Sequence, residues 1–202
     1  MYSSTTEINL ISLANPVELI NPGDPAALSK FAHFLGKLIG EVKKEFSAPQ
    51  IIILCIGSDR STGDSLGPLV GSMLEELHPL NATVMGTLSR PVHALNLAET
   101  RALISEKYSS LPILAVDAGL GQIHKIGCLE VGKGSLKPGA AVRKKLPPIG
   151  HLFITGIVNV GGLMEMMVLQ TTRLGVVLPL ARFISWGIYL AASLAEWERS
   201  TN

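Results

Sequence analysis

The sequence predicts an α/β protein with a three-layer, doubly wound and mostly parallel sheet. Residues 51–56 form an unbroken β-branched apolar run, which is typical of a strand buried on both faces of a parallel sheet. Strand-like and helix-like segments then alternate along the chain, as they do in doubly wound folds. Because neither a repeat nor a linker interrupts them, the 202 residues are expected to form a single domain that begins with an irregular segment, residues 1–23.

The first half of the chain alternates between helix and strand. Asp24 and Pro25 have the properties of an N-cap and a first-turn proline, so a helix is expected from there to about residue 46. The strand at 51–56 ends in a polar loop with glycines. The elements expected after that loop are a helix at about 65–77, a strand at 82–88, a helix at about 93–108 and a strand at 112–116 that stops at Asp117.

The second half is less regular. A shorter strand at 127–131 could run antiparallel, and the Gly, Pro and basic residues of 133–148 indicate an exposed loop. A last strand at 152–155 is followed by GIVNVGG and a helix at about 162–173, whose methionines at 164, 166 and 167 are interpreted as core residues.

The C-terminal segment 174–197 approaches the length of a membrane span, with Arg182 and Glu196 as its only charges. Pro179 and several Gly and Ser residues interrupt its apolar run. A helix starting at Pro179 would place one set of apolar residues at core-facing spacing: Leu180, Phe183, Ile184, Ile188 and Leu194. A buried helix is therefore the favoured interpretation, and no membrane partner is expected.

Composition and charge argue against several classes of protein. With 47% hydrophobic and 16% charged residues the chain is not disordered, and a net charge of +1 gives no reason to expect a nucleic-acid partner. The short basic runs at 43–44 and 143–145 are interpreted as solvated faces. Cys55 and Cys128 lie in apolar runs, as buried reduced thiols do, and no signal peptide is visible, so a cytoplasmic location is expected.

Two acidic residues stand where ligands bind in open α/β sheets, at the carboxyl ends of strands. Asp64 lies in the loop after the 51–56 strand, and Asp117 follows the 112–116 strand. If the two strands are neighbours, the carboxyl groups face one cleft, where a shared proton would let one activate water while the other protonates a leaving group. The same pair could instead hold a divalent cation. The structural alternatives are a helix N-cap for Asp64 and bonding to a glycine-rich turn for Asp117.

Four further residues are candidates for substrate binding. Arg60 could bind a carboxylate or phosphate, but pairing with Asp59 that stiffens the loop is preferred. His93 follows the second strand and could approach the same cleft, with capping or packing as the preferred role. Asn159 could orient a substrate amide or a water, or belong to a tight strand-to-helix turn.

Several motifs carry a family resemblance: CIGSDRSTGDSLGPLVG, GTLSRPVHALNL, AVDAGLG, LKPGAAV, LPPIG and ITGIVNVGGLMEMMVLQTTRL. From about residue 51 onward the chain resembles the YyaC-type sporulation proteins of spore-forming bacteria. That family in turn resembles the germination protease and the hydrogenase-maturation endopeptidase, which share a phosphorylase/hydrolase-like α/β fold. In the germination protease an acid in a T-x-D-x-L-G-P-like loop and an acid ending an A-I-D-A strand are the catalytic pair. They correspond to Asp64 in TGDSLGP and Asp117 in AVDAG.

The resemblance also implies where this chain differs. The hydrogenase-type enzymes hold metal with the two acids and a later histidine, and that position falls near Asn159 here. A metal-free acid pair is therefore favoured, with no cofactor and with a divalent cation at Asp64 and Asp117 as the open alternative. The leading hypothesis is a sporulation-associated peptidase of the forespore or mother cell, acting on a protein or peptide, with homo-oligomer formation left open. Its rivals are a non-catalytic spore protein that keeps the fold and a hydrolase of a small phosphorylated or nucleoside ligand.

Overall fold

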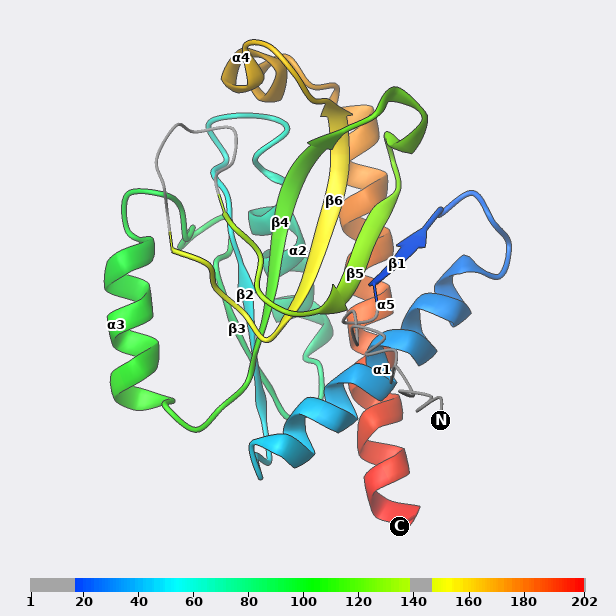
Figure 1. Ribbon diagram of the computed structural model, residues 1–202, viewed down its shortest axis with the longest axis vertical. Helices are drawn as coiled ribbons and strands as arrows, with labels where there is room; N and C mark the ends of the chain where they lie inside the picture. Colours follow the sequence, from blue (N-terminus) through cyan, green and yellow to red (C-terminus); the bar gives the residue numbers. More distant parts are fainter. Residues whose placement is uncertain (1–16, 139–146, 202) are drawn as a thin grey trace, which may run out of the picture.

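The computed structural model describes residues 17–138 and 147–201 and contains one six-stranded sheet, ordered β1-β5-β6-β4-β2-β3 (Figure 1). The strands are β1 (Val17–Ile20), β2 (Ile51–Cys55), β3 (Ala82–Met85), β4 (Ile113–Gly121), β5 (Leu129–Lys133) and β6 (Leu152–Val160). The four strands β6, β4, β2 and β3 run parallel, and β5 and β1 are antiparallel to their neighbours. The predicted α/β fold with a mostly parallel sheet is confirmed.

Helices cover both faces of the sheet (Figure 1). The helices are α1 (Ala27–Glu45), α2 (Leu66–Leu77), α3 (Leu97–Lys107), α4 (Glu165–Gln170) and α5 (Leu174–Thr201), with a 3₁₀ turn, η1, at Ile123–Lys125. On one face, α1, α2 and α5 enclose the larger core with Ile51, Ile53 and Cys55 of β2. On the other face, α3 packs on Ile52 and Leu54. Alternate residues of β2 thus enter two cores, which explains its unbroken apolar sequence.

One side of helix α5 is buried in the larger core of the fold. By length and composition, Leu174–Trp197 would suffice to cross a membrane, and it is the one stretch of the described chain that does. In the fold, however, its buried side chains contact α1 and the sheet: Val177, Leu180, Ala181, Ile184, Ile188 and Ala191. The helix begins at Leu174 with Pro179 inside it, not at Pro179 as the sequence suggested. A cytoplasmic location is compatible with this packing.

The interpretation of residues 43–44 as a solvated face is wrong for Lys43 of α1, whereas Lys44 is exposed as predicted. The Lys43 side chain is 7% exposed and forms an ion pair with Glu196 of α5. Since the two residues are 153 positions apart, local sequence could not reveal the pair. The other short basic run, 143–145, lies outside the described residues.

Several element boundaries differ from the prediction. β1 lies within the N-terminal segment expected to be irregular, where its pairing with β5 makes it a strand. β4 continues past Asp117 to Gly121, and β6 continues past residue 155 to Val160, because the two pair with each other through eight registered residues. Pairing in the middle of a sheet has overridden the low strand propensity of these glycine-containing stretches.

The segment 133–148 is not simply an exposed loop. Leu136 and Ile149 form an antiparallel bridge and are buried in the smaller core, where they pack against the α3 face of the sheet. Residues 139–146 lie outside the described part of the chain. The two thiols, Cys55 and Cys128, are free and buried as predicted.

Candidate functional site

The sheet places the loop that carries Asp64 next to Asp117. β2 and β4 are neighbouring parallel strands, with Cys55 in register with Val116. One residue further, the Ile56 N–H donates to the Val116 carbonyl at 2.7 Å. The loop at residues 57–65 therefore starts at the level of Asp117, at the carboxyl edge where open α/β sheets bind ligands.

Short-range packing fixes the Asp64 loop. The Ser58 N–H donates to the Asp64 carbonyl at 3.1 Å and closes the loop on itself. This closure depends on Gly57, whose φ is +145° and whose missing Cβ would lie 2.0 Å from that carbonyl. On the outer side, the Gly63 N–H donates to the Leu169 carbonyl of α4 at 2.8 Å. The TGD motif thus joins the end of β2 to α4.

The Asp64 carboxyl does not cap α2. Ser65 occupies the N-cap position, and no side chain makes a capping hydrogen bond there, so the structural alternative for Asp64 is wrong. Burial raises the pKa of the Asp64 carboxyl above its ordinary value of 3.8, while the Ser58 backbone and the charge of His93 lower that pKa by smaller amounts. A desolvated carboxyl group that does not cap a helix is the kind of group found at functional sites.

Asp117 is buried inside β4, with 7% of its surface exposed. It lies opposite Thr155 of β6 and on the same face of the sheet as Ala115, which is the face covered by α3. Its Oδ1 accepts a hydrogen bond from the Ala118 N–H at 2.8 Å. The predicted bonding to the following backbone is therefore present, but the following residues form strand and not a glycine-rich turn.

The His93 turn lies beside the Asp64 loop. Val92 pairs with Ile56 at the end of β2, and the Gly57 N–H donates to the Val92 carbonyl at 2.8 Å. The His93 ring also caps its own turn, because Nδ1 accepts the Leu95 N–H at 3.3 Å. Of the six candidate residues, His93 lines a pocket of about 880 Å³ between α3 and β3.

Asp59 and Arg60 are both exposed in the first part of the loop. The preferred interpretation, an ion pair between them, is wrong, because none joins these two described residues. The Arg60 N–H instead donates to the Ser58 hydroxyl at 3.3 Å. The Arg60 guanidinium is therefore available to solvent at the rim of the loop.

Asn159 serves the structure of α4. It lies in β6 and not in a strand-to-helix turn, and its Nδ2 donates to the Thr172 hydroxyl at 3.1 Å and to the Val168 carbonyl at 3.4 Å. Its Oδ1 accepts the Val160 N–H at 2.8 Å. Both ends of the amide are occupied, so this side chain anchors α4 over the carboxyl edge.

Sequence reasoning missed two neighbours of the acids. Thr155 is half-buried beside Asp117 through the β4–β6 register, which no local pattern reveals. The Ser61 hydroxyl is buried without a hydrogen-bond partner in the Asp64 loop. Since buried polar groups are nearly always satisfied, this hydroxyl marks a place for a water or a ligand group. In the sequence, only the position of Ser61 in the S-T-G-D motif pointed to this hydroxyl.

Within the described chain, Asp64 and Asp117 have few potential metal ligands around them. Among residues 17–138 and 147–201, no group of three or more His, Cys, Asp and Glu side chains has the geometry to hold a metal ion. The Asn159 amide, which falls near the metal histidine of the hydrogenase-type enzymes, is occupied by α4. A cation held by Asp64 and Asp117 remains a prediction.

Comparison with known proteins identifies the family. A family model described as "Protein of unknown function (DUF1256)" matches residues 19–187. The chain belongs to this family. It is 45% identical over 162 residues to the uncharacterized protein YyaC of Bacillus subtilis (strain 168), which covers 80% of this chain and 78% of that protein. The resemblance to YyaC-type proteins is confirmed.

This DUF1256 chain is also similar in structure to the [NiFe] hydrogenase maturation protease HycI from Thermococcus kodakarensis KOD1. The sequence identity is 18%, the TM-score is 0.46, and the match covers 77% of this chain and 99% of the protease.

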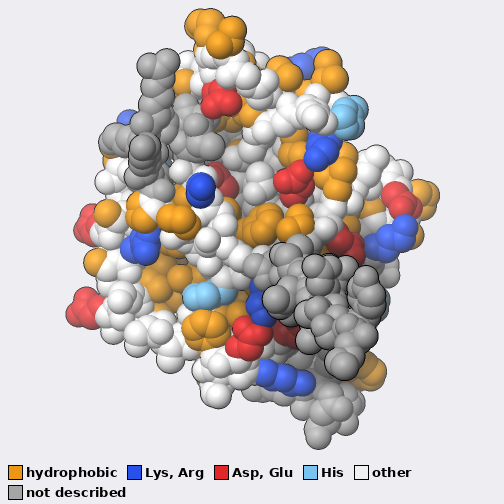
Figure 2. Space-filling model, in the orientation of Figure 1, with side chains coloured by type: hydrophobic (Ala, Val, Ile, Leu, Met, Phe, Trp, Pro, Cys, Tyr) orange, Lys and Arg blue, Asp and Glu red, His pale blue; other side chains and the backbone are white. Residues whose placement is uncertain are grey.

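The surface of α4 corrects one further prediction. The methionines expected in the core are exposed: Met164 by 66%, Met166 by 54% and Met167 by 52%. With Leu163 they form an apolar tip, at the top of Figure 2, beside the edge that carries the Asp64 loop. Exposed groups of methionines are typical of surfaces that contact other polypeptides.

Proposed function

We propose that this protein is a peptidase in which Asp64 and Asp117 activate water to hydrolyse a peptide bond. The observation that carries the proposal is the register of β2 with β4, because it places the start of the Asp64 loop level with Asp117. Burial, which raises the pKa of the Asp64 carboxyl, supports the proposal, because a raised pKa favours the protonated form that a general acid needs.

In the proposed reaction, ionised Asp117 accepts a proton from water as the water oxygen attacks the amide carbonyl carbon. Protonated Asp64 then donates its proton to the amide nitrogen as the carbon–nitrogen bond breaks. One proton is taken and one is given, so the pair ends with its charges exchanged and returns by proton transfer. No cofactor enters this scheme.

The remaining candidates have supporting roles in the proposal. His93, which lies beside the Asp64 loop, orients the substrate next to Asp64. Arg60, exposed at the rim, attracts a carboxylate of the substrate, with Asp59 next to it. Asn159 is assigned to positioning α4 rather than to substrate contact.

A cleavage assay tests the proposal. Purified protein is incubated with spore extract, and new peptide ends are identified by mass spectrometry. Asp64→Asn and Asp117→Asn are each expected to reduce cleavage by about 10²–10⁴-fold, the usual contribution of a general acid or base. Asp24→Asn is the control, since it removes the same charge from an exposed site at the start of α1. Full activity in either acid variant would refute the proposal.

We also propose that the protein acts in the forespore or the mother cell, because its sequence motifs resemble those of YyaC-type sporulation proteins. A fluorescent fusion followed through spore formation tests this location. Equal fluorescence in cells that do not sporulate, without change during sporulation, would contradict it.

A second candidate function is a spore binding protein that retains the fold without catalysis. The exposed methionines of α4 favour it, because an apolar tip of this kind is suited to polypeptide contact. The same extract distinguishes the two: a partner that is retained uncut, together with no new peptide ends, supports the binding protein.

A further inference from the structure

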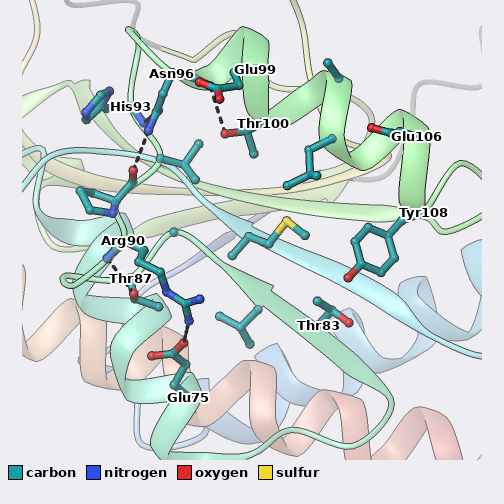
Figure 3. Close-up of a pocket in the computed structure, with 17 residues that line it drawn as sticks. Glu75, Thr83, Thr87, Arg90, His93, Asn96, Glu99, Thr100, Glu106 and Tyr108 are labelled. Atoms are coloured by element: carbon teal, nitrogen blue, oxygen red, sulfur yellow. Dashed lines mark hydrogen bonds and ion pairs between the residues drawn. The ribbon is translucent and has the colours of Figure 1, made fainter.

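A pocket of about 880 Å³ between α3 and β3 has no role in the proposed function apart from His93 at its wall (Figure 3). β3 is at the end of the sheet, so within the described chain its outer edge pairs with no strand. All four of its residues are half-exposed. An edge strand beside a pocket is the geometry by which proteins bind extended peptides, through backbone pairing that adds a strand to the sheet.

The register defines which backbone groups are available on β3. The Ile51 N–H donates to the Asn81 carbonyl at 3.1 Å, and Ile51 is in register with Ala82. In a parallel ladder alternate residues bond to the same neighbour, so Thr83 and Met85 also face β2. The N–H and C=O groups of Ala82 and Val84 therefore point to the outer edge, spaced to receive one strand.

Charge indicates the occupant. Glu99 and Glu106 project from α3, across the pocket from Arg90 and Glu75 (Figure 3). Arg90 is already paired with Glu75 at 3.0 Å. Glu99 and Glu106 are exposed and form no ion pair with any described residue. Between them, Leu103 adds an apolar surface. The pocket thus combines two unneutralised carboxylates with an apolar wall.

We propose that this pocket binds an extended polypeptide segment with alternating basic and apolar side chains, added as a strand to the outer edge of β3. The basic side chains lie against Glu99 and Glu106, and the apolar ones against Leu103 and Met85. Lysine and arginine suit this arrangement because their charged ends reach the carboxylates while their stems cover apolar surface.

The pocket also connects to the proposed catalytic edge. His93 lines the pocket and lies close enough to Asp64 to influence its ionisation. If the proposed peptidase function holds, on which this step rests, the segment bound at β3 is part of the substrate and leads the scissile bond towards the acids. Substrates are then polypeptides with a basic, extended segment next to the cleavage site.

Binding is tested separately from cleavage. A fluorescent peptide of alternating valine and lysine is titrated into the Asp64→Asn protein, and anisotropy gives the Kd. Glu99→Lys with Glu106→Lys is expected to weaken binding by about tenfold or more, as two attractive charges become repulsive. Glu18→Lys with Glu41→Lys makes the same charge change at exposed sites on β1 and α1 and should leave the Kd unchanged. Circular dichroism confirms that both variants fold.

Two more peptides test the backbone pairing. In an added strand, the backbone N–H groups of every second residue face β3, and those of the residues between them face away. One peptide is N-methylated at the first set of residues, which removes the N–H groups that face β3, and the other peptide is N-methylated at the second set. Loss of binding by one of these two peptides only supports strand addition. Absence of binding, equal effects of the two charge variants, or equal effects of the two methylation patterns would each overturn the inference. Binding that follows these expectations while wild-type protein cleaves nothing would support the pocket and refute the peptidase.

Discussion

Asn159 offers a sharp test, because the sequence left open whether it orients a substrate or supports the fold. The structure predicts that Asn159→Ala removes two hydrogen bonds from Nδ2, to the Thr172 hydroxyl at 3.1 Å and to the Val168 carbonyl at 3.4 Å. The bond from the Val160 N–H to Oδ1 is also lost, but Val160 is exposed and water can replace it. At about 0.5–1.5 kcal/mol for each of these two part-buried bonds, the free energy of unfolding should fall by about 1–3 kcal/mol.

Urea denaturation measures this loss, and a double-mutant cycle with Thr172→Val isolates the bond between the two side chains. The expected coupling free energy is about 0.5–1.5 kcal/mol. Hydrogen exchange supplies the local readout. The Gly63 N–H bonds to the Leu169 carbonyl of α4, so it should exchange faster in Asn159→Ala once α4 is loosened.

The reasoning would be refuted by a variant that loses peptide cleavage or binding while its stability and Gly63 exchange stay at wild-type values. In that case Asn159 contacts the substrate directly, and its bonds to α4 contribute little.

Four other predictions follow from single contacts. Because burial raises the Asp64 pKa above 3.8, the folded protein loses stability as the pH rises from 3.8 through the raised pKa of the folded state. Asp64→Asn should therefore raise the free energy of unfolding at neutral pH and leave it unchanged below pH 3.8. A lower free energy of unfolding at neutral pH would contradict this prediction. Burial lowers the pKa of His151, whose Nδ1 accepts the Ile113 N–H at 2.9 Å, so stability should fall as pH drops below 6.5, and His151→Asn, which keeps an acceptor, should flatten that fall in acid titrations followed by circular dichroism. Gly57→Ala forces a Cβ to 2.0 Å from the Asp64 carbonyl at a φ of +145°, and should lower stability by at least about 1–3 kcal/mol in thermal denaturation, whereas Gly40→Ala in α1, where a Cβ meets nothing within 4 Å, should raise it by about 0.5–1 kcal/mol. Chelation by EDTA should leave cleavage unchanged, since the proposed reaction uses the carboxyl groups alone; loss of cleavage that zinc or manganese restores would move the two acids to a metal role.

The fold class could be predicted because its signal is local. The apolar run of β2 reports burial on two faces without reference to any other segment. The positions of Asp64 and Asp117 after separate strands were equally visible, but their meeting required that β2 and β4 be neighbours, which is a property of strand order. The acid pair therefore depended on strand order: β2 and β4 are neighbours, and the pairing of the two carboxyl groups stays a prediction.

The features that sequence reasoning missed depend on partners distant in the chain. β1 is a strand because it pairs with β5, and Lys43 can be buried because it forms an ion pair with Glu196 of α5. β4 and β6 extend beyond their apolar runs because each is the other's partner. The pocket at β3 arises from the space between an edge strand and α3, and neither element shows it alone.

A carbon-13 titration of the Asp64 carboxyl tests most directly whether the two acids act together. The measurement compares the wild-type protein with Asp117→Asn, which removes the second charge and keeps its size. Interacting carboxyl groups titrate as a pair, so a shared site predicts that the Asp64 pKa, raised in the wild type, falls in the variant. Superimposable titration curves in the two proteins would mean that the acids do not sense each other, and the proposed chemistry would then have no site.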